Sequence, residues 1–327
     1  MNSPIIQLEH VNKQFKNKLA VSNLSLEIQS GSIVAILGPN GAGKTTTMKM
    51  LLGMCKPTTG NITVLGQSPN QQQVRQQIGV MLQDVSVIDG LTVREIIHMV
   101  HSYYHSPLPI DEIERLTGLS QIDLKRRAEK LSGGQKRSLN FALAMAGDPK
   151  LLFLDEPTVG MDSETRKYFW KQVRQLTQAG KTVLFTTHYL QEADEAADRI
   201  ILFSEGRIIA DGTPESLKSG LTKRILSFSA QHGMIPGESA IPLDTQLDHN
   251  NMNANSPNVH IEAQIAMLPN VEQVEYRNGR WSLYTTDTDT LIRDVIQRQL
   301  PIRDIRIETG QLDDAYAELL ATMKEEQ

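Results

Sequence analysis

The stretch GPNGAGKTT, residues 38–46, has the residue types and spacing of a loop that binds phosphate groups. In the pattern G-x-x-x-x-G-K-[ST], glycines turn the backbone so that successive N–H groups face phosphate oxygens. The lysine, here Lys44, reaches the terminal phosphates, and the next hydroxyl, Thr45, ligates magnesium. An apolar run precedes the stretch and a helical pattern follows it, which favours a phosphate site over an incidental glycine-rich turn.

Acidic and imidazole groups occur where buried strands are expected to end. Asp155, in LLFLDEPT, is placed to hold a magnesium shell, and Glu156 beside it faces the opposite way if the pleat continues. Glu156 is therefore the candidate for orienting and deprotonating an attacking water, with a helix or turn cap as the alternative. His188 ends the run VLFTTH, where polar residues of a parallel sheet line the ligand crevice.

The stretch LSGGQKRS, residues 131–138, has the features of a second phosphate site. A small hydroxyl residue, two glycines and an amide stand just ahead of a helical pattern, and a helix N-terminus attracts anions.

Apolar runs at residues 32–38, 150–156 and 181–188 predict buried strands. Helical spacing recurs around residues 93–100, 139–146 and 169–176. This alternation predicts a mainly parallel sheet covered on both faces. Residues 5–11 and 24–29 alternate apolar and polar side chains, so we expect them in a small antiparallel sheet at the edge.

Composition limits the classes of function. The chain has 327 residues and a formal net charge of -5, which predicts about two domains and argues against a broad nucleic-acid footprint. Its single cysteine, Cys55, fits a reducing cytosol. We expect no signal peptide and no membrane span, because no run approaches the roughly 18 apolar residues a membrane helix needs.

The composition changes after Thr213. Residues 232–258 are rich in Asn, Asp, Pro and Gly, which predicts a long loop. Strands are expected at 224–230, 271–277, 281–286 and 302–308, with a hairpin at Asn278-Gly279. Helical spacing is seen around 292–296 and 312–319, and a further helix is possible at 261–267. That order resembles a ferredoxin-like βαββαβ unit.

Four motifs, GPNGAGKTT, LSGGQ, LLFLDEPT and TTH, occur in the order and spacing of one family. By these motifs, residues 5 to about 217 resemble the ATP-binding subunit of an ABC transporter. The resemblance implies that Phe15 stacks on adenine with Val21 nearby, and that Gln83 in VMLQD senses magnesium and couples to the membrane subunit. Asp162 in VGMD falls at the family's D-loop, although the preceding residues depart from the commoner SALD.

The resemblance also explains the second phosphate site, because LSGGQ of one subunit closes over ATP held by another. The expected catalytic residues are Lys44, Glu156 and His188. The expected nucleotide-binding residues are Phe15, Val21, Gly38, Asn40, Gly41, Ala42, Gly43, Lys44, Thr45, Thr46 and Gln83. The residues expected to contact the ATP of a second chain are Ser132, Gly133, Gly134, Gln135 and Asp162, and the expected magnesium ligands are Thr45, Gln83 and Asp155.

The expected fold is a P-loop NTPase core of the ABC ATPase type, α/β in class, with an edge antiparallel sheet and a helical subdomain at about 84–130. We expect this ATP-binding domain at residues 1–220 and a small α+β, ferredoxin-like accessory domain at 221–327. The expected cofactors are ATP and Mg²⁺, and the chain should dimerise with itself or with a similar subunit.

The stretches THYLQEADEAADRI and IRIETGQLDDAYAEL resemble the ABC-2 type exporter branch, which includes daunorubicin-resistance and sodium-extrusion systems. That branch implies a separate membrane permease as partner, a place on the cytoplasmic face of the cell membrane, and export of a drug, lipid, polysaccharide or ion. The rival class is a soluble ABC ATPase that acts on a ribosome, nucleic acid or protein assembly. A member that has lost hydrolysis is a further alternative.

Overall fold

The structure is a computed structural model that describes residues 3–83, 87–221, 224–230, 265, 267–277, 279–285, 287–298, 300, 302–309 and 316. The chain divides into two compact units, Met1–Pro214 and Glu215–Gln327. Within the described part, no helix has both the length and the apolar character needed to cross a membrane.

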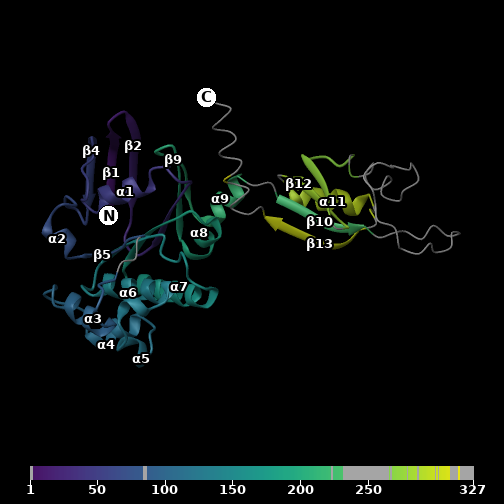
Figure 1. The fold of residues 1–327 in the computed structure, drawn as a ribbon. Coiled ribbons are helices and arrows are strands. Elements are labelled where there is room, and N and C mark those ends of the chain that lie inside the picture. Colours follow the sequence, from purple (N-terminus) through teal and green to yellow (C-terminus); the bar gives the residue numbers. More distant parts are fainter. Residues whose placement is uncertain are drawn as a thin grey trace. The chain divides into compact units, whose positions relative to one another are not determined.

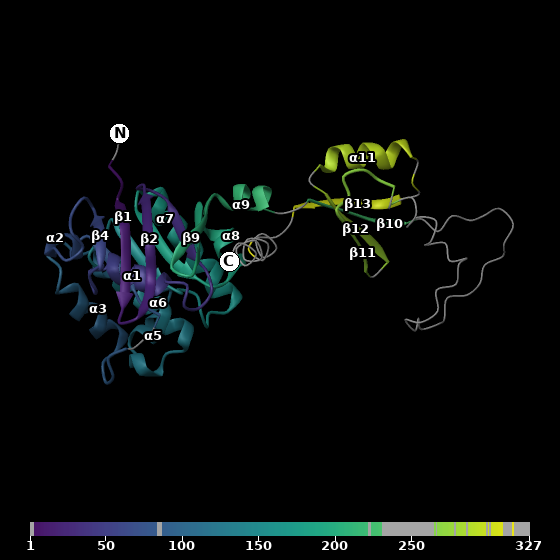
Figure 2. The same ribbon diagram turned by 90° about the horizontal axis from the view of Figure 1, so that it is seen from above.

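A six-stranded sheet forms the centre of the first unit (Figures 1 and 2). Its order is β5-β6-β7-β3-β8-β9, and all neighbours are parallel except β8 and β9. All five residues of β3 are buried, because both faces of the sheet are covered. This confirms the expected mainly parallel sheet. The strands are β3 (Ile33–Leu37), β5 (Ile78–Met81), β6 (Leu151–Asp155), β7 (Thr182–Thr187), β8 (Arg199–Ser204) and β9 (Arg207–Gly212).

Helix α1 (Lys44–Leu51) and a three-stranded antiparallel sheet share a core with one face of the central sheet. That antiparallel sheet has the order β2-β1-β4, from Lys18–Ile28, Ile6–Phe15 and Thr59–Val64. Val34 and Phe153 lie in the shared core. The expected small antiparallel sheet is therefore present, with β4 as an additional strand.

Helices α6 (Gly133–Met145), α7 (Ser163–Gln178) and α8 (Leu190–Ala196) cover the other face (Figure 1). The ring centroids of Phe141 and Phe169 are 4.8 Å apart, which joins α6 to α7. Trp170 of α7 packs on Phe185 of β7, and their ring centroids are 4.7 Å apart. The helix α2 (Gln72–Arg75) precedes β5.

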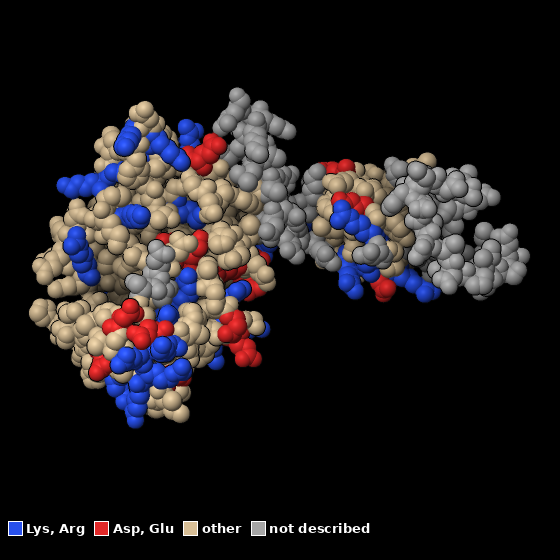
Figure 3. Space-filling view, viewed as in Figure 1, with Lys and Arg blue, Asp and Glu red and all other residues tan. Residues whose placement is uncertain are grey.

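A helical subdomain packs against α6 through a separate apolar cluster that includes Val93, Ile113 and Leu139. It contains α3 (Val93–His101), α4 (Ile110–Leu116), α5 (Gln121–Leu124) and a 3₁₀ turn at Ala128–Lys130. Thr92 and Glu95 form a capping box that begins α3. On the face shown in Figure 3, basic side chains gather near α5 beside acidic ones.

The second unit contains a four-stranded antiparallel sheet of order β11-β12-β10-β13 with α11 (Thr288–Gln297) packed on it. Its strands are β10 (Arg224–Ala230), β11 (Gln273–Arg277), β12 (Arg280–Thr285) and β13 (Ile302–Thr309), and α9 (Pro214–Leu221) precedes them. This strand order is that of a ferredoxin-like split βαβ unit. Arg277 pairs with Arg280, which confirms the expected hairpin, although Asn278 is outside the described residues.

The expected loop at 232–258 lies outside the described residues. The same holds for the helices expected at 261–267 and 312–319, apart from Ile265 and Tyr316, which are helical, and Met267.

Candidate functional site

The stretch 38–46 connects β3 to α1, as its pattern predicts. Gly41 and Gly43 have φ of 84° and 104°, a region that favours glycine. A Cβ on Gly43 would lie 2.7 Å from the Ala20 carbonyl oxygen, so this position has no room for a side chain. No side chain caps the start of α1, which leaves the first helical N–H groups for an anion.

Lys44 curls back over this loop. Its Nζ donates hydrogen bonds to the carbonyl oxygens of Gly38 at 2.6 Å and Pro39 at 3.1 Å. Burial lowers the pKa of the Lys44 amine, and the negative charges of Glu156 and Asp155 act in the opposite direction. The phosphate loop therefore lies beside the two carboxylates that were predicted from a distant part of the sequence.

The two carboxylates differ in surroundings and in backbone conformation. Asp155 is the buried last residue of β6 and accepts a hydrogen bond from the Thr186 hydroxyl. The strand was expected to run through Glu156, but it ends one residue earlier, and Glu156 has a left-handed φ of 47°. The direction of its side chain is thus set by a turn and not by the pleat.

The Glu156 carboxylate is held from two sides. Gln83 Nε2 donates to Oε2 at 2.9 Å, and His188 Nδ1 lies 2.9 Å from Oε1. Gln83 follows β5, Glu156 follows β6 and His188 follows β7, so the three residues meet at one edge of the parallel sheet. A carboxylate fixed in this way can orient a water molecule and accept its proton.

Residues from the starts of α6 and α7 line a groove of about 750 Å³. The predicted residues among them are Ser132, Gly133, Gly134, Gln135 and Asp162. Ser132 and Gln135 form a capping box, and Asp162 accepts a hydrogen bond from the Thr165 amide at 2.8 Å. That bond lowers the pKa of Asp162. We call the groove that these five residues line the α6–α7 groove.

The α6–α7 groove and the phosphate loop are separate sites in this chain. Among the described residues, no hydrogen bond connects Ser132, Gln135 or Asp162 to the loop. The Gln135 N–H is bonded to the Ser132 hydroxyl, so the groove offers the N–H groups of Gly133 and Gly134 at the start of α6. Free N–H groups at a helix start can bind an anion.

Phe15 and Val21, the two residues expected beside adenine, occupy different environments. Phe15 ends β1, its side chain is 49% exposed, and Lys13 Nζ lies 4.8 Å from the ring centroid. Val21 is fully buried, and its Cγ2 would lie 3.6 Å from a Cβ on Gly43. Phe15 thus has an open ring surface on which a ligand can stack, whereas Val21 supports the loop from the core.

Two residues that were not predicted, Arg137 and Thr186, hold the backbone at Glu156. Arg137 of α6 donates to the main-chain oxygens of Glu156 at 2.9 Å and Gln83 at 3.2 Å. Thr186 receives the Glu156 N–H at its main-chain oxygen, 3.1 Å away, and at its hydroxyl, 3.2 Å away. The only sequence signal for Arg137 was its position two residues after Gln135.

Comparison with known families gives one match, in which residues 21–159 fit the family described as ABC transporter. The chain is 40% identical over 218 residues to Nod factor export ATP-binding protein I of Burkholderia lata, covering 65% of this chain and 72% of that protein. The protein of the same name from Rhizobium leguminosarum is 41% identical over 224 residues, with coverages of 66% and 71%.

Solved structures resemble about two thirds of this chain. A dimeric post-hydrolysis state of an ATP-binding cassette bound to ADP and Pi superposes with a TM-score of 0.58 and 25% identity, covering 64% of this chain and 98% of that one. An ATP-binding subunit of an ABC transporter superposes with a TM-score of 0.60 at 23% identity, covering 66% and 92%, and shares the fold.

Proposed function

This chain belongs to the ABC transporter ATP-binding family, and from that membership we propose that it hydrolyses ATP to power a separate membrane permease of an exporter. The observation that carries the proposal is the Glu156 carboxylate, held by Gln83 and His188 beside the phosphate loop. Relatives named for Nod factor export support the assignment to an exporter of the ABC-2 type.

ATP binding would use the phosphate loop and the open ring of Phe15. The N–H groups at the start of α1 and the Lys44 amine are the donors for the phosphates, and Val21 supports the loop. The Lys44 amine must exchange its hydrogen bonds to Gly38 and Pro39 for phosphate oxygens. The remaining loop residues with this role are Asn40, Gly41, Ala42, Gly43, Thr45 and Thr46.

The residues available for Mg²⁺ are Thr45, Asp155 and Gln83. Their hydroxyl, carboxylate and amide oxygens are the ligand type that Mg²⁺ prefers. Gln83 uses its amide nitrogen for Glu156, which leaves its oxygen for a cation. When bound, Mg²⁺ neutralises phosphate charge.

Hydrolysis would use Glu156 as the general base. Its carboxylate orients the attacking water and takes its proton, while Gln83 and His188 keep both oxygens in place. Lys44 offsets the negative charge that develops on the phosphates.

The α6–α7 groove would bind the phosphates of an ATP held by a second chain. The chain carries one copy of each half-site, so two chains would place two ATP molecules at their interface. One of the similar solved structures is itself dimeric and bound to ADP and Pi. We propose a dimer of this chain with itself or with a similar subunit, held together by ATP and released by hydrolysis.

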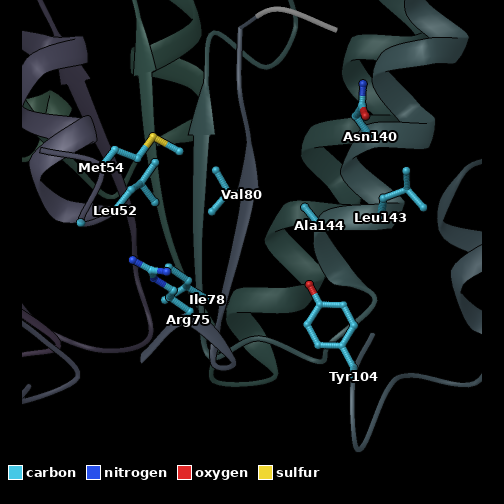
Figure 4. Close-up of a pocket in the computed structure, with 10 residues that line it drawn as sticks. Leu52, Met54, Arg75, Ile78, Val80, Tyr104, Asn140, Leu143 and Ala144 are labelled. Atoms are coloured by element: carbon cyan, nitrogen blue, oxygen red, sulfur yellow. The ribbon is translucent and has the colours of Figure 1, made fainter. Parts of the chain in front are cut away.

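A second groove, of about 510 Å³, is where we propose that the permease binds. Figure 4 shows side chains of β5 and the segment after α1 facing side chains of α6 and Tyr104 across it. Apolar Leu52, Ile78 and Leu143 line it together with Arg75 and Tyr104, which suits a short amphipathic helix of the permease. This partner would hold the chain at the cytoplasmic face of the membrane.

The test is purification of Glu156→Gln from detergent-solubilised native cells with ATP, followed by mass spectrometry. We expect a polytopic membrane protein in stoichiometric amounts, because the variant should stay in the ATP-bound dimer. Lys44→Ala is the matched control and should lose ATP-dependent assembly. Recovery of ribosomal, nucleic-acid-processing or other soluble proteins in place of a membrane protein would favour a soluble ABC ATPase.

A further inference from the structure

Arg137 is a buried cation that joins two turns of the ATP site. It lies in the second turn of α6 and is only 8% exposed. Its NH1 donates to the Glu156 main-chain oxygen at 2.9 Å and its NH2 to the Gln83 main-chain oxygen at 3.2 Å. One guanidinium therefore holds the backbones of two residues that lie far apart in the sequence and whose side chains bond to each other.

The surroundings of Arg137 are acidic and enclosed. Burial lowers the pKa of its guanidinium, and the charges of Glu156 and Glu192 act against that change. Glu192 of α8 is itself 6% exposed and accepts hydrogen bonds from the Thr158 hydroxyl and from Trp170 Nε1 at 3.3 Å. The guanidinium thus remains charged in a place where a cation is costly unless it is paired.

The Glu156 backbone needs such support. A left-handed φ is unfavourable for a non-glycine residue and persists where neighbours fix it from several sides. Thr186 holds the Glu156 N–H, and Arg137 holds its carbonyl oxygen. The two peptide groups flanking the Glu156 Cα are therefore both anchored, which fixes the direction of the side chain.

Arg137 also belongs to the helix whose first turn lines the α6–α7 groove. We propose that Arg137 is a positioning residue for Glu156, and that it links the Glu156 and Gln83 turns to the helix that would contact the ATP of a second chain. The inference rests on the proposed function, because it assigns Arg137 an effect exerted through Glu156. A displacement of α6 on dimerisation would be carried to the general base by the two hydrogen bonds.

The shape of the side chain matters for this role. A guanidinium presents several N–H donors in a rigid fork and can reach two carbonyl oxygens at once. A lysine ammonium is a compact charge on a flexible stem, so it can replace one of the bonds while keeping the charge. Arg137→Lys should therefore keep more activity than Arg137→Met.

The experiment compares ATP hydrolysis by wild type, Arg137→Lys and Arg137→Met in the full chain. We expect kcat of Arg137→Met to fall about 10- to 100-fold, the usual effect of a misplaced catalytic group, with KM for ATP unchanged. Adding Arg137→Met to Glu156→Gln should cause a smaller loss than in wild type, since the carboxylate it positions is already absent and only its bond to the Gln83 turn is left to lose.

The matched control is Arg174→Met on α7. Arg174 also donates to a main-chain oxygen, that of Ala196 at 2.8 Å, and pairs with Asp198, and it touches none of the proposed catalytic residues. It should keep wild-type kcat. ATP binding by each variant reports folding, and Arg137→Gln serves as a second variant if Arg137→Met does not fold.

Two results would overturn the inference while leaving the proposed function in place. One is that Arg137→Met and Arg137→Gln both keep wild-type kcat while Glu156→Gln hydrolyses ATP slowly. The other is a loss from Arg137→Met that is as large in the Glu156→Gln background as in wild type. Wild-type hydrolysis by Glu156→Gln itself would instead overturn the proposed general base and this inference with it.

Discussion

At Glu156 a single backbone angle decides where the proposed general base points. The residue type and its position after a buried strand were readable from LLFLDEPT, but the left-handed φ was not. That conformation depends on Thr186 and Arg137, which come from β7 and α6. A contact between distant segments leaves no local sequence pattern. The contacts of Thr186 and Arg137 with the Glu156 backbone could therefore not be predicted.

Glu156→Gln should slow ATP hydrolysis by about 100-fold or more, the usual scale for loss of a general base, and leave ATP binding intact. The amide keeps the size of the side chain but cannot take a proton. Single-turnover hydrolysis and equilibrium ATP binding measure the two effects. Glu195→Gln, an exposed acid on α8, is the control. Wild-type turnover in Glu156→Gln would remove Glu156 from the role.

At the scale of elements, the phosphate loop depends on glycine conformations that a side chain would disturb. Gly43 combines a positive φ with the close Ala20 carbonyl oxygen, whereas Gly31 has a φ of 85° and open space where a Cβ would lie. Adding a Cβ at Gly31 would cost stability only through the backbone angle, whereas adding one at Gly43 would also create a clash. Comparing the two positions therefore separates these two effects on stability.

Gly43→Ala should therefore destabilise the fold more than Gly31→Ala and should also weaken ATP binding. Gly31→Ala should cost about 1–2 kcal/mol, since only the backbone angle is disfavoured. Urea unfolding and ATP titration of both variants measure this. Equal stability losses would show that the loop can shift away from Ala20 at no cost.

Helix α7 begins with a charged cap whose contribution depends on pH. Hydrogen bonds from Thr165 hold the pKa of Asp162 below its usual range. A carboxyl with a depressed pKa in the folded state stabilises the fold above its unfolded pKa, and this contribution disappears as the pH falls through the folded pKa.

Asp162→Asn keeps a capping oxygen but removes the charge. We expect wild type to be more stable than the variant near neutral pH, with the difference shrinking below about pH 4, where aspartate ordinarily begins to titrate. Urea unfolding at a series of pH values tests this. A difference that is independent of pH would contradict it.

The elements with strong local patterns were the ones that could be predicted. β3, β6 and β7 are uniformly buried, so they read as apolar runs, and α7 follows from its helical spacing. β5 has only four residues, and its Gly79 lies so close to α6 that a Cβ would be 2.3 Å from the Ala144 carbonyl oxygen. Such an approach between distant segments is visible only in three dimensions.

At the scale of the whole molecule, each unit has its own apolar core. The cluster around Val34 and Phe153 belongs to the first unit, and the cluster around Phe228 and Leu283 belongs to the second. All the residues predicted for the ATP site fall in the first unit. We propose that the chain consists of an ATP-binding domain at residues 1–220 and an accessory domain at residues 221–327.

The separation of the α6–α7 groove from the phosphate loop has a genetic consequence. In a dimer of identical chains, Ser132→Arg would damage both interfaces through the groove, and Lys44→Ala would damage both through the loop. A mixed dimer would have one interface built from the intact loop of the first variant and the intact groove of the second. The two alleles should therefore complement each other. Mixing the purified variants should restore ATP hydrolysis that neither has alone, and no recovery would mean that each chain completes its own site.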